Sequence, residues 1–229
     1  MTRALRGDVL CIIPARAGSR RLPNKNIAPL DGRTLLERAV VTALQAFGEA
    51  VVSTDSPHYA DIARAAGAHV PGLRPAELST DDAPIDDVIH HLVATLDTPA
   101  QTVVLMQVTT PFTVSADLEA VVAALVARPD AGCSLTATRV PAAYASILVD
   151  RGGLYTFADA GLAARRTQDV PTIALPTGGA YAARIARLRA GEPLLQSPFA
   201  VVEVDPARAV DIDDAADLAR AERLASGCA

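Results

Sequence analysis

Short apolar runs alternate with longer segments of helical periodicity along most of this chain, and that alternation limits its possible folds most strongly. A short apolar run bounded by polar residues is typical of a strand buried on both faces, as in parallel sheets covered by helices. Strands are predicted at residues 8–13, 49–53, 68–70, 102–107, 133–138, 180–183 and 200–204. Helices are predicted at residues 34–47, 57–66, 85–96, 116–127 and 213–225. The pattern predicts an α/β fold with a doubly wound, mostly parallel sheet.

One segment interrupts this pattern. Periodicity weakens between residues 140 and 176, where Pro141, Gly152 and Gly153 indicate a hairpin or another excursion from the sheet. No repeat, low-complexity tract or linker divides the 229 residues. We therefore expect a single domain over residues 1–229, with a small flap at about 140–170.

Charge and cysteine content exclude several classes of protein. A net charge of −5 argues against a nucleic-acid-binding protein, whose phosphate contacts need a basic surface. Cys11, Cys133 and Cys228 are too few and too scattered for a disulfide framework or a zinc site. The first apolar run is too short to cross a membrane, and Pro14 and Arg16 interrupt it as a signal-peptide core. We expect a soluble cytoplasmic protein without a membrane partner.

Polar clusters follow the expected strands at residues 14–26, 54–56, 107–110 and 211–213. Ligands of open α/β sheets bind beyond the carboxyl ends of the strands, so these clusters are expected to meet in one site. The first cluster has a Gly-Ser turn, whose backbone N–H groups can cradle an anion. Arg16, Arg21 and Lys25 add the positive charge that suits a triphosphate. The segment matches neither the Walker loop nor the dinucleotide fingerprint.

Lys25 is the single lysine among 21 basic residues. A chain that otherwise uses arginine suggests that a compact ammonium is needed here, where a planar guanidinium would not fit. Chance retention on an exposed loop is the alternative interpretation.

Asp211 and Asp213 are two residues apart, so in an extended segment their side chains point the same way. Two carboxylates on one face offer the oxygen ligands that Mg²⁺ prefers, and Mn²⁺ is a possible substitute. The alternative is an acidic helix start, because aspartate is common at helix N-caps.

Several segments, in the same order along the chain, resemble the cytidylyltransferases that activate acidic sugars, and most resemble their acylneuraminate (CMP-sialic acid synthetase) branch. The similar segments are residues 13–27, 52–56, 74–78 with Asp81, 106–111, 165–171, 177–181 and 210–214. The resemblance implies a Rossmann-like nucleotidyltransferase fold. It also implies a homodimer whose contact is the flap, where aromatic side chains such as Tyr144, Tyr155 and Phe157 are concentrated.

The reaction that the resemblance implies is attack by an acid's oxygen on the α-phosphorus of CTP, with release of pyrophosphate. Arg16, Arg21 and Lys25 would contact the phosphates as catalytic residues. The nucleotide-binding residues would be Ala15, Ala17, Gly18, Ser19, Asn26 and Arg74. The acid-binding residues would be Gln107, Thr109, Thr110, Arg166, Gln168 and Tyr181. The family's matching aspartates bind metal, which supports Asp211 and Asp213 as Mg²⁺ ligands.

The chain departs from the family pattern on the acid side. An arginine that usually ends the segment beginning at Gln107 is Thr113 here, and no lysine occurs in residues 140–150. The favoured acceptor is an acylneuraminate or a related nonulosonic acid. A smaller non-sugar acid, such as a phosphonate of specialised metabolism, is one alternative, and a non-catalytic nucleotide-binding module is another.

Overall fold

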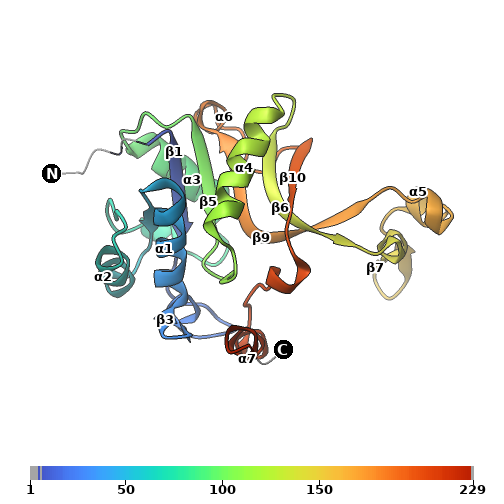
Figure 1. Ribbon diagram of the computed structural model, residues 1–229, viewed down its shortest axis with the longest axis horizontal. Coiled ribbons are helices and arrows are strands. Elements are labelled where there is room, and N and C mark those ends of the chain that lie inside the picture. The colour runs from blue at the N-terminus through green and yellow to red at the C-terminus, as the bar shows by residue number, and fades with distance from the viewer. Residues whose placement is uncertain (1–4, 6, 228–229) are drawn as a thin grey trace.

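A six-stranded sheet forms the centre of the computed structural model, which describes residue 5 and residues 7–227 (Figure 1). Its strands lie in the order β10-β6-β9-β5-β1-β4. The strands are β1 (Val9–Pro14), β4 (Val51–Ser53), β5 (Thr102–Met106), β6 (Cys133–Val140), β9 (Ile173–Arg184) and β10 (Phe199–Glu203). Strand β1 runs parallel to β4 and β5, and β10 runs parallel to β6. Only β9 is antiparallel to its neighbours within this described sheet.

Helices cover both faces of the sheet because its central strands are apolar on both sides. Cys11 and Ile13 pack in one core cluster, whereas Leu10 and Ile12 pack in a second. The first face is covered by α1 (Leu35–Phe47), α2 (Pro57–Ala65), α4 (Ser115–Ala127) and α7 (Ala215–Ala225). The second face is covered by α3 (Ile85–Thr95) and α6 (Ile185–Arg189). The predicted doubly wound, mostly parallel α/β fold is confirmed.

Helix α1 begins where its capping sequence predicts. The Thr34 hydroxyl accepts a hydrogen bond from the Glu37 N–H, and the Glu37 carboxylate accepts one of 2.7 Å from the Thr34 N–H. This reciprocal pair satisfies two N–H groups that the helix itself cannot. The hydrogen bonds from Thr34 also hold the pKa of Glu37 below its usual value.

The chain leaves the sheet between β6 and β9, in the region where the periodicity is weak. A two-stranded hairpin of β7 (Leu148–Asp150) and β8 (Tyr155–Phe157) is followed by the short helix α5 (Ala160–Ala163). This excursion projects away from the body of the molecule (Figure 1). Leu154 and Tyr155 are 76% and 65% exposed, so its apolar side chains are largely uncovered within one chain.

One local prediction is wrong, one is too short, and one helix was missed. Residues 68–70 do not form a strand: His69 makes an isolated bridge to Val51. The strand predicted at 180–183 is the end of the much longer β9, whose early part has a polar and glycine-rich sequence that hides the signal. Helix α6 was not expected, because five residues are too few for a clear helical period. A further small ribbon, β2 (Pro29–Leu30) with β3 (Arg33–Thr34), precedes α1.

The described cysteines, Cys11 and Cys133, are free and buried, as expected for core residues. Burial raises the pKa of the Cys11 thiol to about 12 and that of Cys133 to about 11. Cys228 lies outside the described residues. Among the described helices, none has the length and apolar character needed to cross a membrane.

Gly132 marks a close approach between two backbones, where the chain enters β6. Its N–H donates to the Pro198 carbonyl at 2.8 Å, just before β10. A Cβ placed on Gly132 would lie 2.1 Å from the carbonyl oxygen of Gln196. Because that atom belongs to the backbone, no side-chain rotation can relieve the overlap.

We predict that Gly132→Ala lowers the free energy of unfolding by about 3 kcal/mol, measured by urea denaturation, since β10 must shift away from β6. Gly72→Ala is the matched control, because its added Cβ meets no atom within 4 Å. The control should stay within about 0.5 kcal/mol of the parent. Equal unfolding midpoints for both variants would contradict the steric argument.

Candidate active site

The carboxyl ends of β1, β4 and β5 open into a pocket of about 530 Å³. It lies where the sequence places its polar clusters, at one edge of the sheet. Its polar lining residues are Arg16, Ser19, Arg20, Arg21, Lys25, Asn26, Arg74, Thr80, Asp81, Gln107 and Thr109. Most of the residues predicted for phosphate and nucleotide binding therefore meet in one place.

The segment after β1 is held in place by backbone hydrogen bonds. The N–H of the buried Ala15 donates to the Ser53 carbonyl at 2.9 Å, which extends the pairing of β1 with β4. The Ala17 N–H donates to an Asp55 carboxylate oxygen at 2.7 Å. The Asn26 amide then donates to the Arg16 carbonyl at 2.9 Å, closing the loop on itself. Ala15 and Ala17 shape this loop through their backbone groups.

Four basic side chains of this loop are balanced by two carboxylates. Arg16 and Arg20 both form ion pairs with Asp81. Arg21 and Lys25 lie 2.9 and 3.0 Å from the same oxygen, Oδ1 of Asp213. The Lys25 side chain is only 14% exposed, whereas that of Arg21 is 67% exposed. Lys25 is thus the most enclosed of the four cations.

Arg74 forms the buried end of the basic pocket. Its Nε donates to the Ser53 hydroxyl at 3.0 Å, and its Nη2 donates to the Ser53 carbonyl at 2.7 Å. Burial is the main influence that lowers the pKa of this guanidinium, and the nearby Asp55 opposes it. Ser53 and Asp55 therefore position Arg74 at the end of β4.

Asp211 and Asp213 approach the pocket from the segment between β10 and α7. The Ile212 N–H donates to the Thr109 carbonyl at 2.8 Å, which joins this segment to the loop after β5. Burial raises the pKa of Asp211, and the neighbouring charge of Asp213 adds to the shift. The hydrogen bond from Lys25 lowers the pKa of Asp213. The two carboxylates are thus neighbours in different electrostatic settings.

The donor chemistry of this pair fits Mg²⁺. Two carboxylates with an amide oxygen of Gln107 nearby supply hard oxygen ligands, and a magnesium ion commonly completes its octahedron with phosphate and water. Within the described ranges, no group of three or more His, Cys, Asp and Glu is arranged to hold a metal. A metal here must therefore take most of its ligands from a bound nucleotide and water.

Two of the residues expected on the acid side, Gln107 and Thr110, lie against Gly178 of β9 together with Asp211. A Cβ on Gly178, whose φ is +78°, would lie 3.6 Å from an Asp211 carboxylate oxygen, 3.6 Å from the Thr110 methyl and 3.9 Å from the Gln107 amide oxygen. Tyr181 is half-buried further along β9, and burial raises the pKa of its hydroxyl. The side chains of Gln107, Thr110 and Asp211 therefore converge on one glycine.

Arg166 and Gln168 are not brought to this pocket within one chain. They lie on the excursion, in a short 3-10 turn at Thr167–Asp169 and its N-cap. Arg166 pairs with Asp169 at 2.7 Å, and its side chain is 77% exposed. Their predicted role in acid binding cannot be filled from their own chain in this arrangement.

Sequence reasoning gave no role to Asp81, Ser53, Asp55 or Arg20. Asp81 holds two arginines of the loop, and Ser53 and Asp55 orient Arg74 and Ala17. The available signal was position: Ser53 and Asp55 end a buried strand, and Asp81 follows the segment that begins at Arg74. The sequence does not show which partner each of these side chains contacts.

A family model described as cytidylyltransferase matches residues 10–159. The CMP-N,N'-diacetyllegionaminic acid synthase of Legionella pneumophila is 46% identical over 112 residues, covering 45% of this chain and 47% of that protein. The N-acylneuraminate cytidylyltransferase of Escherichia coli is 40% identical over 110 residues, covering 47% of this chain and 26% of the relative. The chain thus spans less than half the length of these curated relatives.

Solved structures share the fold at lower identity. A CMP:2-keto-3-deoxy-manno-octonic acid synthetase complexed with CTP superposes with a TM-score of 0.73 at 19% identity, covering 96% of this chain and 99% of the other. A 4-diphosphocytidyl-2C-methyl-D-erythritol synthase from Anaerococcus prevotii gives 0.59 at 16% identity, covering 95% and 98%. The match over residues 10–159 shows that the chain belongs to the cytidylyltransferase family.

Proposed function

We propose that the protein transfers CMP from CTP to an acidic acceptor and releases pyrophosphate. The observation that carries the proposal is the pairing of Arg21 and Lys25 with Asp213 in a pocket at the strand ends. A basic loop alone would suit any anion, but a basic loop facing two carboxylates suits a triphosphate bound with a metal. Membership of the cytidylyltransferase family supports cytidine as the base.

In the proposed reaction, an anionic oxygen of the acceptor forms a bond to the α-phosphorus. The bond from that phosphorus to the bridging oxygen breaks, and pyrophosphate leaves with the electron pair. Arg16, Arg21 and Lys25 would neutralise charge on the phosphate oxygens and on the leaving group, which is the main task in phosphoryl chemistry. Gly18 and Ser19 would offer backbone N–H groups, and Asn26 and Arg74 would hold the nucleoside.

Asp211 and Asp213 would hold Mg²⁺, and Mn²⁺ could replace it. When bound, the metal supplies Lewis-acid stabilisation of charge on phosphate oxygens. Lys25 and Arg21 now share the Oδ1 oxygen of Asp213, so this oxygen would become free for a metal when these cations turn to a phosphate. The exchange of partners would couple nucleotide binding to metal binding.

We propose an acylneuraminate or a related nonulosonic acid as the acceptor, bound by Gln107, Thr109, Thr110 and Tyr181. The printed names of the Legionella and Escherichia relatives support this class. Thr113 stands where the family pattern has an arginine, which favours the second candidate, a smaller acid such as a phosphonate. The complete set of phosphate-binding and metal-binding residues argues against a non-catalytic module.

We also propose a cytoplasmic homodimer. The exposed apolar side chains of the excursion, among them Leu154, Tyr155 and Phe157, support a two-fold contact through this segment. Such a contact would give Arg166 and Gln168 a route to the acid side of the partner's pocket. The free, buried thiols of Cys11 and Cys133 are compatible with a reducing compartment.

A panel of nucleotides and acids tests the proposed activity. We expect pyrophosphate release from CTP with at least one nonulosonic acid. Release from ATP or GTP should be much slower, because a purine is larger than the cytosine that Asn26 and Arg74 would enclose. Acylneuraminates, Kdo and phosphonates should be compared in the same assay. Equal release from ATP would contradict the cytidine assignment, and activity confined to phosphonates would select the second candidate.

Metal dependence tests the aspartate pair. Asp211→Ala and Asp213→Ala should each lower kcat at least about a hundredfold, because a metal's charge stabilisation is worth several kcal/mol and each 1.36 kcal/mol is tenfold. EDTA should abolish turnover, and Mg²⁺ should restore it. Asp97→Ala, at an exposed turn, is the matched control and should behave like the parent. Full activity in EDTA or in both site variants would remove the metal assignment.

Lys25 tests whether shape matters beyond charge. Lys25→Arg keeps the charge, yet we expect kcat/KM for CTP to fall at least about tenfold, or about 1.4 kcal/mol, because the wide guanidinium must fit a space that is nearly closed. Lys25→Ala should be worse, while the melting temperature changes little in either. Full efficiency in Lys25→Arg would mean that the lone lysine has no special role.

A further inference from the structure

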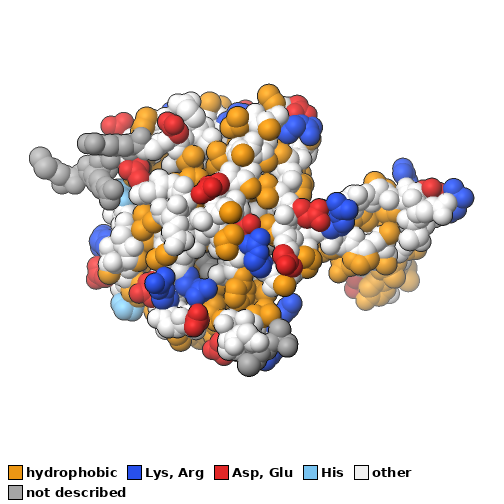
Figure 2. All heavy atoms as spheres, in the orientation of Figure 1, with side chains coloured by type: hydrophobic (Ala, Val, Ile, Leu, Met, Phe, Trp, Pro, Cys, Tyr) orange, Lys and Arg blue, Asp and Glu red, His pale blue; other side chains and the backbone are white. Residues whose placement is uncertain are grey.

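A second groove lies on the far side of the loop that follows β5. Gln107 and Thr109 of this loop face the candidate active site, whereas residues 111–115 line a groove of about 350 Å³ between α1 and the start of α4. The two hollows share no lining residue. The groove opens on the face of the molecule that carries α1 and α4, where several Lys or Arg side chains gather (Figure 2).

Three arginines surround this groove: Arg33, Arg38 and Arg208. Arg38 is half-buried, and its Nε is enclosed without a hydrogen-bond partner. An enclosed N–H of a guanidinium that lacks an acceptor costs free energy, which an anionic ligand would recover if the side chain turned toward the groove. Among the described residues, neither Arg33 nor Arg38 forms an ion pair.

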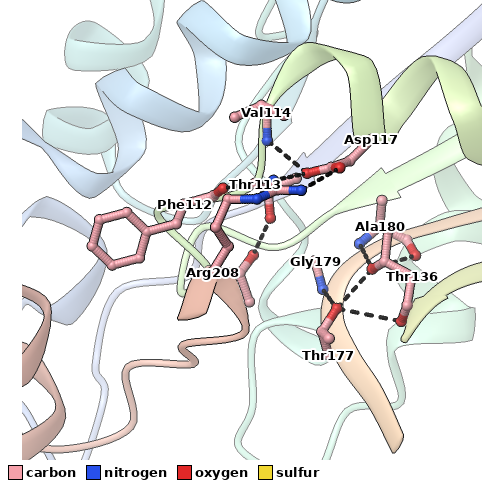
Figure 3. A network of polar contacts seen from close by, with 10 residues as sticks. Phe112, Thr113, Val114, Asp117, Thr136, Thr177, Gly179, Ala180 and Arg208 are labelled. Atoms are coloured by element: carbon pink, nitrogen blue, oxygen red, sulfur yellow. Dashed lines mark hydrogen bonds and ion pairs between the residues drawn. The ribbon is translucent and has the colours of Figure 1, made fainter. Parts of the chain in front are cut away.

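The nearby carboxylates are already engaged. Asp117 receives two hydrogen bonds from Arg208, at 2.5 and 3.0 Å, and another from the Val114 N–H (Figure 3). Glu37 accepts hydrogen bonds from Thr34, which lower its pKa, and the charge of Arg33 lowers the pKa of Glu37 further without a direct ion pair between these two described residues. Arg33 and Arg38 therefore leave the groove with excess positive charge.

The remaining wall suits a compact anion rather than a peptide. Val114 occupies the N-cap of α4, and its side chain cannot accept a hydrogen bond from the first-turn N–H groups. The helix dipole adds positive potential at this end. Val41 and Phe112 give the groove an apolar side, and its volume limits the ligand to a small molecule.

We propose that this groove is a second, separate binding site for a compact polyanion carrying phosphate or carboxylate groups, held chiefly by Arg33 and Arg38. The Arg38 side chain would turn so that its guanidinium, Nε included, donates to the anion, and Arg33 would close over the exposed side. Arg208 stays paired with Asp117, which neutralises its charge. The site is independent of the proposed transfer reaction, since none of its residues lines the candidate active site.

Calorimetric titration with inorganic pyrophosphate tests the proposal on the whole protein. The parent should bind two equivalents per chain, one in each hollow. Arg33→Gln/Arg38→Gln should lose one of them, its affinity falling at least about tenfold, because two charge-assisted contacts are removed. Lys25→Ala should weaken only the other. Citrate is titrated in parallel. Citrate binding that is lost in the double variant would show that the groove accepts carboxylates, whereas pyrophosphate binding alone would show that it is selective for phosphate.

Arg64→Gln/Arg151→Gln removes the same charge from exposed positions elsewhere and should still bind two equivalents. Arg38→Lys keeps the charge without the Nε donor and should bind more weakly than the parent but more tightly than the double variant. Turnover of CTP in the double variant checks that the fold is intact. Pyrophosphate binding in the parent that Arg33→Gln/Arg38→Gln leaves unchanged, whether one equivalent or two, would overturn the proposal, whereas a single equivalent lost in that variant would contradict only binding at the candidate active site.

Discussion

The candidate active site depends on how its own positive charge is balanced before a ligand arrives. Arg16, Arg20, Arg21 and Lys25 lie on one loop, and like charges so close would repel one another in a partly enclosed pocket. Asp81 and Asp213 each take two of these cations. The two carboxylates thereby offset this repulsion and hold the four cations around the pocket.

Asp81 and Asp213 would have different roles when a nucleotide binds. Asp81 lies on the wall of the pocket and orients Arg16 and Arg20 from outside the phosphate path. Asp213 is next to Asp211, whose pKa is raised by partial desolvation and by the charge of Asp213, so that corner attracts a cation. In this structure the Lys25 ammonium provides positive charge at that corner. In the proposed reaction the same lysine would also contact a phosphate, so it would take part in both nucleotide binding and metal binding.

Much of this arrangement could be predicted from the sequence because strand ends are marked by their composition. The buried run of β1 ends at Pro14, and the basic loop begins at once, so its place at the sheet edge follows from topology alone. The acid side was harder. Arg166 and Gln168 were expected there on resemblance, but the excursion carries them away from the pocket in one chain. The direction in which an irregular segment leaves a sheet depends on packing that its local sequence does not encode.

One continuous strand, β9, links the end of the excursion to the residues around Gly178. Its first part pairs with β6 at Ile173–Pro176, where the excursion returns, and its last part pairs with β5 at Ala180–Arg184. Gly178 and Tyr181 lie on the same continuous strand. A one-residue slip in the pairing of Ile173–Pro176 with β6, if it were carried along the strand, would turn Gly178 and Tyr181 to the opposite face of the sheet. A change at the base of the excursion therefore reaches Gly178 along the strand without contacting it.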